Sequence, residues 1–118
     1  MAVRNGFPTN DTLFGTSNDD TIRGFEGDDT LYGLQGDDRL VGGDGNDDID
    51  TGNGSDLVYG GLGDDTIRGG FGGIDTIYGG GGNDVIFTME VVTAGTSVAF
   101  GGAGDDTFIA TAISTATI

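Results

Sequence analysis

Residues 60–68 read GGLGDDTIR, and this nine-residue unit, repeated along the chain, decides the fold. Residues 33–41 read GLQGDDRLV, 42–50 read GGDGNDDID, 79–87 read GGGGNDVIF and 101–109 read GGAGDDTFI. The sixth position of each unit is Asp and the eighth is apolar. Self-similarity at a short fixed period indicates a solenoid, in which each unit is one element of a stack.

The sixth-position aspartates set the spacing of the repeat. Successive aspartates lie nine residues apart up to Asp65, and longer steps then occur before Asp75 and Asp106. The complete set is Asp11, Asp20, Asp29, Asp38, Asp47, Asp56, Asp65, Asp75, Asp84 and Asp106. The apolar residues that follow them are Leu13, Ile22, Leu31, Leu40, Ile49, Val58, Ile67, Ile77, Ile86 and Phe108.

Each position of the unit has a structural reason. Glycines at positions one, two and four permit a tight turn, because glycine readily adopts positive φ. The last three residues, such as Thr30-Leu31-Tyr32, favour a short strand whose middle side chain points to the opposite face from its neighbours. One inward apolar residue per unit is buried only if units stack, with two units forming one coil. The sequence therefore predicts two narrow parallel sheets, and it lacks the spacing of an amphipathic helix.

The composition restricts the partners of the chain. The 118 residues carry a net charge of -16, and 26 of them are glycine, so the chain forms one domain with little apolar core. Such acidity makes nucleic acid and anionic membranes poor partners and favours multivalent cations. The absence of Cys and His excludes thiolate zinc and haem ligation. No apolar segment is long enough to span a membrane, and the N-terminus does not resemble a signal peptide.

The turns concentrate carboxylates and bend the backbone so that carbonyl oxygens converge. Calcium takes about six to eight such oxygen ligands in flexible geometry, whereas magnesium fits an all-protein cage less well. Turns of alternate units stack, so we expect two rows of aspartates. The first edge carries Asp11, Asp29, Asp47, Asp65 and Asp84, and the second edge carries Asp20, Asp38, Asp56 and Asp75. Without a cation these rows repel, so we expect the calcium-free chain to be largely disordered and calcium to fold it.

The unit GGxGxDxUx, where U is a bulky apolar residue, resembles the RTX (hemolysin-type) calcium-binding nonapeptide, and the resemblance covers about residues 6–109. It implies a right-handed parallel β-roll, a β-solenoid with two short-strand sheets and calcium-binding turns. It also implies that calcium is bound by the ten aspartates with turn backbone carbonyls. The carbonyls expected to contribute are those of Gly24, Gly27, Gly33, Gly36, Gly42, Gly43, Gly45, Gly60, Gly61, Gly63, Gly79, Gly80 and Gly82.

The resemblance further implies an extracellular protein exported by the signal-peptide-independent type I route, which binds several Ca²⁺ ions and folds on meeting them. Other domains of a larger secreted protein are then expected partners. The family's proteins include toxins, metalloproteases, lipases, alginate epimerases and adhesins. We expect this chain itself not to be an enzyme: adjacent carboxylates could perform glycoside hydrolysis, but a catalytic pair need not recur in most units.

Several units depart from the pattern. Units 6–14 and 15–23 lack the fourth-position glycine, Thr51 replaces a first-position glycine, and unit 69–78 has one inserted residue. Residues 88–100 carry no motif and are interpreted as a degenerate unit with a long turn and a strand at 98–100. Asp106 then joins the first edge; if 88–100 is instead looped out, Asp106 joins the second edge.

Two further features leave alternatives open. Aromatic and arginine residues at the ninth position could form a face that docks a polysaccharide or surface, as in an adhesin or an epimerase accessory module, although cross-strand packing also explains them. The uncharged tail, residues 110–118, is expected to cap the roll, and an export signal or an open edge for association are its alternatives. The predicted organisation is thus a single RTX β-roll domain over residues 1–118.

Overall fold

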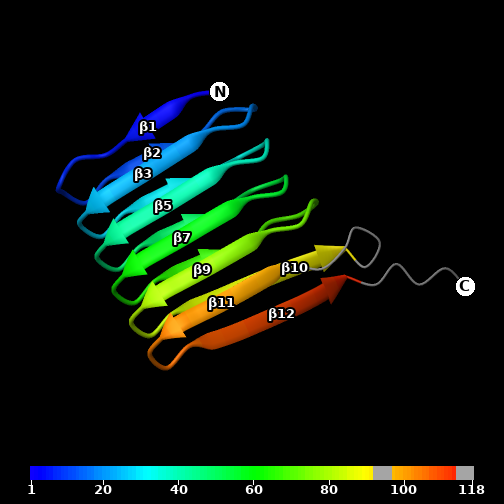
Figure 1. The fold of residues 1–118 in the computed structure, drawn as a ribbon. Helices are drawn as coiled ribbons and strands as arrows, with labels where there is room; N and C mark the ends of the chain where they lie inside the picture. The colour runs from blue at the N-terminus through cyan, green and yellow to red at the C-terminus, as the bar shows by residue number, and fades with distance from the viewer. Residues whose placement is uncertain (92–96, 114–118) are drawn as a thin grey trace, which may run out of the picture.

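The computed structural model describes residues 1–91 and 97–113, which form two six-stranded sheets joined by tight turns. The chain crosses from one sheet to the other and back in every coil, so consecutive strands belong to different sheets (Figure 1). Sheet A contains β1 (Val3–Asn5), β3 (Thr21–Glu26), β5 (Arg39–Asp44), β7 (Leu57–Leu62), β9 (Thr76–Gly81) and β11 (Val98–Ala103). Sheet B contains β2 (Thr12–Phe14), β4 (Thr30–Tyr32), β6 (Asp48–Asp50), β8 (Thr66–Arg68), β10 (Val85–Val91) and β12 (Thr107–Ile113).

Every strand pair is parallel and joins residues one coil apart. Leu40 pairs with Val58, 18 residues later, and the same step relates most neighbours in both sheets. The step lengthens to 19 where Val58 pairs with Ile77, because unit 69–78 holds the inserted residue. The strands on both sides of the insertion keep the regular pairing, so the extra residue is accommodated in the turn before Asp75. These registers confirm the predicted parallel β-roll.

The core is a single row of inward side chains. It consists of the eighth-position residues of eight consecutive units, each with no exposed surface: Ile22, Leu31, Leu40, Ile49, Val58, Ile67, Ile77 and Ile86. Leu13 and Ala99 pack against the ends of this row and are partly buried. Each inward residue is covered by the coils above and below it, as the period predicts. The core is only one side chain wide, which agrees with a molecular thickness of 15 Å.

The turns depend on glycine where two coils approach closely. Gly43 has φ of +115°, and a Cβ placed on it would collide with the carbonyl oxygen of Phe25 in the preceding coil. Phe25 and Leu34 occupy the same second position and are the non-glycine residues with positive φ among those described. Their backbone strain is tolerated because the surrounding ladder fixes the turn.

The strands of sheet A from β3 onward are longer than the predicted three residues. In β3 and β5 the ladder continues past the first-position glycine, with Phe25 pairing with Gly43 and Glu26 with Asp44. Sheet B strands keep three residues as far as β8. The first-edge turns are therefore more extended than the second-edge turns.

The last two strands of sheet B also extend beyond the nonapeptide pattern. Residues 88–91 continue β10 and pair with residues 110–113 of β12. The degenerate unit thus begins with strand rather than turn, and its expected strand at 98–100 is present at the start of β11. Residues 92–96 and 114–118, with most of the expected cap, lie outside the described residues. Within residues 1–91 and 97–113 there is no helix of the length and apolarity needed to cross a membrane.

Candidate metal sites in the turns

The predicted aspartates line the two edges of the roll. Turns leading from sheet A to sheet B carry the first-edge row, and return turns carry the second-edge row. Asp106 lies one coil beyond Asp84, whose backbone N–H donates to it, so Asp106 joins the first edge. Eight of these carboxylates are no more than 2 % exposed: Asp20, Asp29, Asp38, Asp47, Asp56, Asp65, Asp75 and Asp84. A row of buried acids with no facing base is a costly arrangement unless something compensates the charge.

One oxygen of each buried carboxylate holds neighbouring coils together. The backbone N–H of Asp29 donates to Oδ1 of Asp47 over 2.8 Å, and that of Asp47 donates to Oδ1 of Asp65 over 2.8 Å. The same bond joins sixth-position aspartates along both edges. The expected stacking of aspartates from alternate units is therefore present, with most partners 18 residues apart. The contact is a hydrogen bond from main chain to carboxylate.

The second oxygen is buried without any hydrogen-bond partner in six of these residues. They are Asp29, Asp38, Asp47, Asp56, Asp65 and Asp84. A buried carboxylate oxygen that accepts no bond is strongly destabilising, and a bound cation is one arrangement that would satisfy it. Among the described residues no three acidic side chains surround one point, so a cation at these oxygens would need main-chain carbonyls as well.

A main-chain carbonyl lies beside five of the six unpartnered oxygens, those of Asp29, Asp38, Asp47, Asp65 and Asp84. A Cβ built on Gly24 would collide with Oδ2 of Asp29 and would lie 2.6 Å from the carbonyl oxygen of Gly42, one coil later. The equivalent Cβ on Gly42 would meet Oδ2 of Asp47 and the carbonyl oxygen of Gly60 at 2.5 Å. The first-position glycine therefore keeps open a space into which a carboxylate and a carbonyl oxygen both project. This oxygen-rich space suits a hard cation such as Ca²⁺.

The electrostatics of the buried row agree with this chemistry. Burial raises the pKa of Asp65 to about 7, and those of Asp38, Asp47, Asp56 and Asp75 to about 6. Burial, followed by repulsion from neighbouring acids, likewise raises the pKa of Asp29 and Asp84. The backbone N–H bonds oppose these shifts without cancelling them. Burial thus disfavours the ionised form of these carboxylates unless a cation compensates their charge.

The two N-terminal units are built differently. Oδ2 of Asp20 accepts hydrogen bonds from the backbone N–H and the hydroxyl of Thr16, and Oδ2 of Asp11 accepts one from Phe7 N–H. Burial alone would raise the pKa of Asp20, but the bonds from Thr16 and Ala2 outweigh it and lower the pKa. These turns lack the fourth-position glycine and satisfy their carboxylates with protein donors. Their oxygens are less available to a cation.

The second edge changes toward its C-terminal end. Asp75 N–H donates to the hydroxyl of Ser97 over 3.1 Å, where other coils provide an aspartate. Thr51 replaces a first-position glycine, is fully buried, and accepts a bond from Gly70 N–H. The second edge therefore has two unpartnered oxygens, at Asp38 and Asp56, whereas the first edge has four.

A second ladder runs through the exposed fifth positions. Asn46 N–H donates to Oδ1 of Asp28, and Asp64 N–H donates to Oδ1 of Asn46, each within 2.9 Å. These bonds run in the opposite direction along the stack from those of the sixth-position ladder. On the first edge the fifth-position residues alternate between amide and acid: Asn10, Asp28, Asn46, Asp64, Asn83 and Asp105. The alternation separates like charges and could have been read from the sequence.

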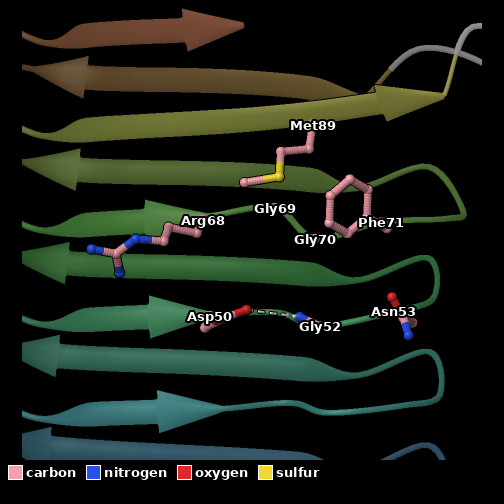
Figure 2. Close-up of a pocket in the computed structure, with 8 residues that line it drawn as sticks. All are labelled: Asp50, Gly52, Asn53, Arg68, Gly69, Gly70, Phe71 and Met89. Atoms are coloured by element: carbon pink, nitrogen blue, oxygen red, sulfur yellow. Dashed lines mark hydrogen bonds between the residues drawn. The ribbon is translucent and has the colours of Figure 1, made fainter. Parts of the chain in front are cut away.

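Two surface hollows lie away from the aspartate rows. One, of about 180 Å³, occurs where β10 runs past the turn that holds the inserted residue (Figure 2). Phe71 and Met89 flank the backbone of Gly69 and Gly70 there, with Arg68 and Asp50 at the side of sheet B. The other is lined by Phe25, Glu26, Gly43 and Asp44. Neither is lined by a sixth-position aspartate, so neither is the candidate metal site.

Aromatic side chains at the ninth position stack on the outer faces of the sheets. On sheet A the Tyr59, Tyr78 and Phe100 rings are 5.1 Å apart and nearly parallel, and Arg39 lies over Tyr59. On sheet B, Phe14 stacks on Tyr32. Cross-strand packing, one of the two sequence interpretations, thus occurs at these positions.

The sequence model of one family matches most of the chain. It describes the RTX calcium-binding nonapeptide repeat, and four copies match at residues 5–40, 41–73, 72–88 and 91–112. No curated protein and no solved structure matches the chain significantly.

Proposed function

The chain belongs to the family of RTX calcium-binding nonapeptide repeats, and from this premise we propose that it is a module whose folding is driven by the uptake of several Ca²⁺ ions. The observation that carries the proposal is the set of six buried carboxylate oxygens without a partner. A cation binding there compensates the buried charge and is a ligand of the folded state alone. Its binding energy therefore becomes folding energy.

The proposed ligands of each ion come from two adjacent coils on the same edge of the roll. At Asp47, Oδ2 supplies the side-chain oxygen, and the carbonyl of Gly60 in the next coil supplies a main-chain oxygen. Oδ1 remains bonded to Asp29 N–H, so cation binding does not require the ladder to break. The same arrangement applies at Asp29, Asp38, Asp65 and Asp84, whereas Thr51 replaces the first-position glycine in the unit of Asp56. Asp11, Asp20, Asp75 and Asp106 remain candidates from the family pattern, with weaker support from their surroundings.

A calcium titration by calorimetry tests this directly. We expect several ions per chain, in a number similar to that of the six unpartnered oxygens. The Asp47→Asn variant should bind fewer ions or bind them more weakly, because it removes one ligand charge and keeps the Oδ1 acceptor. Asp44→Asn removes the same charge from an exposed residue of the same turn and serves as the control. A stoichiometry of one or none would contradict the proposal.

The setting we propose is extracellular, in a protein exported by the type I route, where calcium is plentiful enough to saturate modest sites of about 10⁻⁴ to 10⁻³ M. Such a module would remain unfolded during export and fold afterwards. Support comes from the family and from the charge of -16, which opposes folding without cations. Secretion of the chain by a type I exporter, measured with and without external calcium, tests this setting.

Calcium-dependent binding of a polysaccharide through sheet A is a second candidate, favoured by the row of exposed rings at Tyr59, Tyr78 and Phe100. Sugars stack on free ring faces, however, and the faces of these rings are directed at one another. We therefore rank this function below calcium-driven folding. A glycan array probed with and without calcium tests this second function, since specific calcium-dependent binding of a glycan would support it.

A further inference from the structure

Arg4 occupies a position that is apolar in every other described coil of the roll. It pairs with Ile22 in the ladder between β1 and β3, so its side chain leaves the strand on the same face as the buried Ile22. The other arginines, Arg23, Arg39 and Arg68, stand at seventh or ninth positions on the outer faces. Arg4 is thus a charge in the inward row, at the N-terminal end of the stack, where it is exposed.

The strand edges at the two ends of the roll match each other. Among residues 1–91 and 97–113, β1 pairs only with β3 and β2 only with β4 at the N-terminal end, and β11 pairs only with β9 and β12 only with β10 at the C-terminal end. Both ends therefore present one open strand of each sheet, in the same direction (Figure 1). A second copy moved along the stack would place its β1 on β11 and its β2 on β12. Both sheets would continue in parallel.

The turn ladders match as well. Within the described residues, Asp106 N–H has no acceptor, and Oδ1 of Asp11 lacks the main-chain donor found in inner coils. At the fifth position, Asp105 is bonded only to the coil before it and Asn10 only to the coil after it. Stacking a second copy would pair these groups and keep the alternation of amide and acid in phase. It would also cover Phe108, which is 53 % exposed, with Leu13.

We infer that Arg4 is the residue that prevents this end-to-end stacking, and that the contact it blocks is one between copies of this chain. In the stacked arrangement Arg4 would lie over Ala99, inside the roll, where the inward neighbours are apolar. Enclosing an unpaired guanidinium is unfavourable, and inward charges protect open strand edges in this way. A stack of this kind does not close on itself, so without Arg4 it would grow into filaments.

Sedimentation velocity of the 118-residue chain in millimolar calcium tests the role of Arg4. The native chain and the control Arg39→Leu, which adds the same side chain to the outer face of sheet A, should remain monomeric. Arg4→Leu should assemble, with an average mass that rises at least about twofold over a tenfold increase in concentration. Adding Phe108→Lys to Arg4→Leu should restore the monomer, because it charges the opposite end at an already exposed position.

Two outcomes would overturn the inference. One is an Arg4→Leu chain that shows the calcium-induced β-sheet spectrum yet stays monomeric; the other is assembly of the native chain or of Arg39→Leu to the same extent. Stacking brings Asp106 close to Asp11, so we also expect chelator to disperse the assemblies. That last expectation rests on the proposed function. Calcium titration of the native chain tests the proposed function separately from the stacking.

Discussion

Asp47 shows how one residue serves two purposes in this fold. Its Oδ1 accepts a main-chain hydrogen bond from the coil before, and its Oδ2 is buried beside a carbonyl of the coil after. The first contact fixes the register of the turn, and the second leaves a space suited to a cation. Asn could replace the first role but not the second, because an amide cannot neutralise a divalent ion. This explains the aspartate at the sixth position of every unit.

A first-position glycine should be required for calcium binding. Gly42→Ala places a methyl group against Oδ2 of Asp47 and the carbonyl of Gly60, so we expect loss of that site and lower stability in calcium. Gly81→Ala is the matched control, since Gly81 has no positive φ and its Cβ would meet only the flexible end of Leu62 at 3.2 Å. Calcium titration and urea unfolding should separate the two variants. Equal effects of both changes would argue against the assigned space.

The raised carboxyl pKa values predict an acid-stabilised fold when calcium is absent. Because burial raises the pKa of Asp65 to about 7 and of Asp47 to about 6, the folded chain binds more protons than the unfolded chain above pH 3.8. The stability of the calcium-free roll therefore falls as pH rises from about 4 to about 7, and changes little above that range. Circular dichroism in calcium-free buffer should show more β-sheet at pH 4.5 than at pH 8. More β-sheet at the higher pH would contradict the assignment.

At the scale of the element, each coil is held by three kinds of contact. Parallel strands supply main-chain bonds, one inward side chain supplies burial, and two carboxylate or amide ladders join the turns. Each nonapeptide unit contributes only one fully buried apolar residue, so the apolar surface buried in each coil is small. The ladders at the turns therefore carry a larger share of the coil-to-coil contact than in a conventional sheet protein.

Two substitutions of Asp64 can separate the contribution of the fifth-position hydrogen bonds to stability from the contribution of charge. Asp64→Ala removes the acceptor for Asn83 N–H and should cost about 0.5–1.5 kcal/mol. Asp64→Asn removes the charge and keeps an acceptor, so it should cost less, or stabilise by relieving repulsion. Urea unfolding at saturating calcium measures both. A larger loss for the asparagine variant would indicate that the fifth position acts through its charge.

The period of the sequence was sufficient to predict most of the elements. Asp at the sixth position and an aliphatic residue at the eighth located the edges, the inward row and the partner 18 residues away. Glycines at positions one, two and four predict a turn, and the longer β3 and β5 arise because extended main chain in adjacent coils pairs regardless of side chain. The role of Thr16 at Asp20 also depends on three-dimensional contacts, since the pattern shows only a missing glycine.

At the scale of the whole molecule, charge and geometry depend on each other. A chain with net charge -16 holds eight carboxylates in buried rows, and it has only four basic side chains to offset them. Arg68 pairs with Asp48 on the outer face of sheet B, away from those rows. The fold is thus arranged around charge that its own side chains leave uncompensated. Such uncompensated buried charge is expected in a protein whose folding depends on calcium binding.

Far-UV circular dichroism of the chain in chelator, followed by millimolar calcium, tests the central claim most directly. We expect a disordered spectrum in chelator at pH 8 and a cooperative change to β-sheet as calcium is added, with equal magnesium leaving the chain largely disordered. A structured β-sheet spectrum in chelator that calcium leaves unchanged would contradict the account.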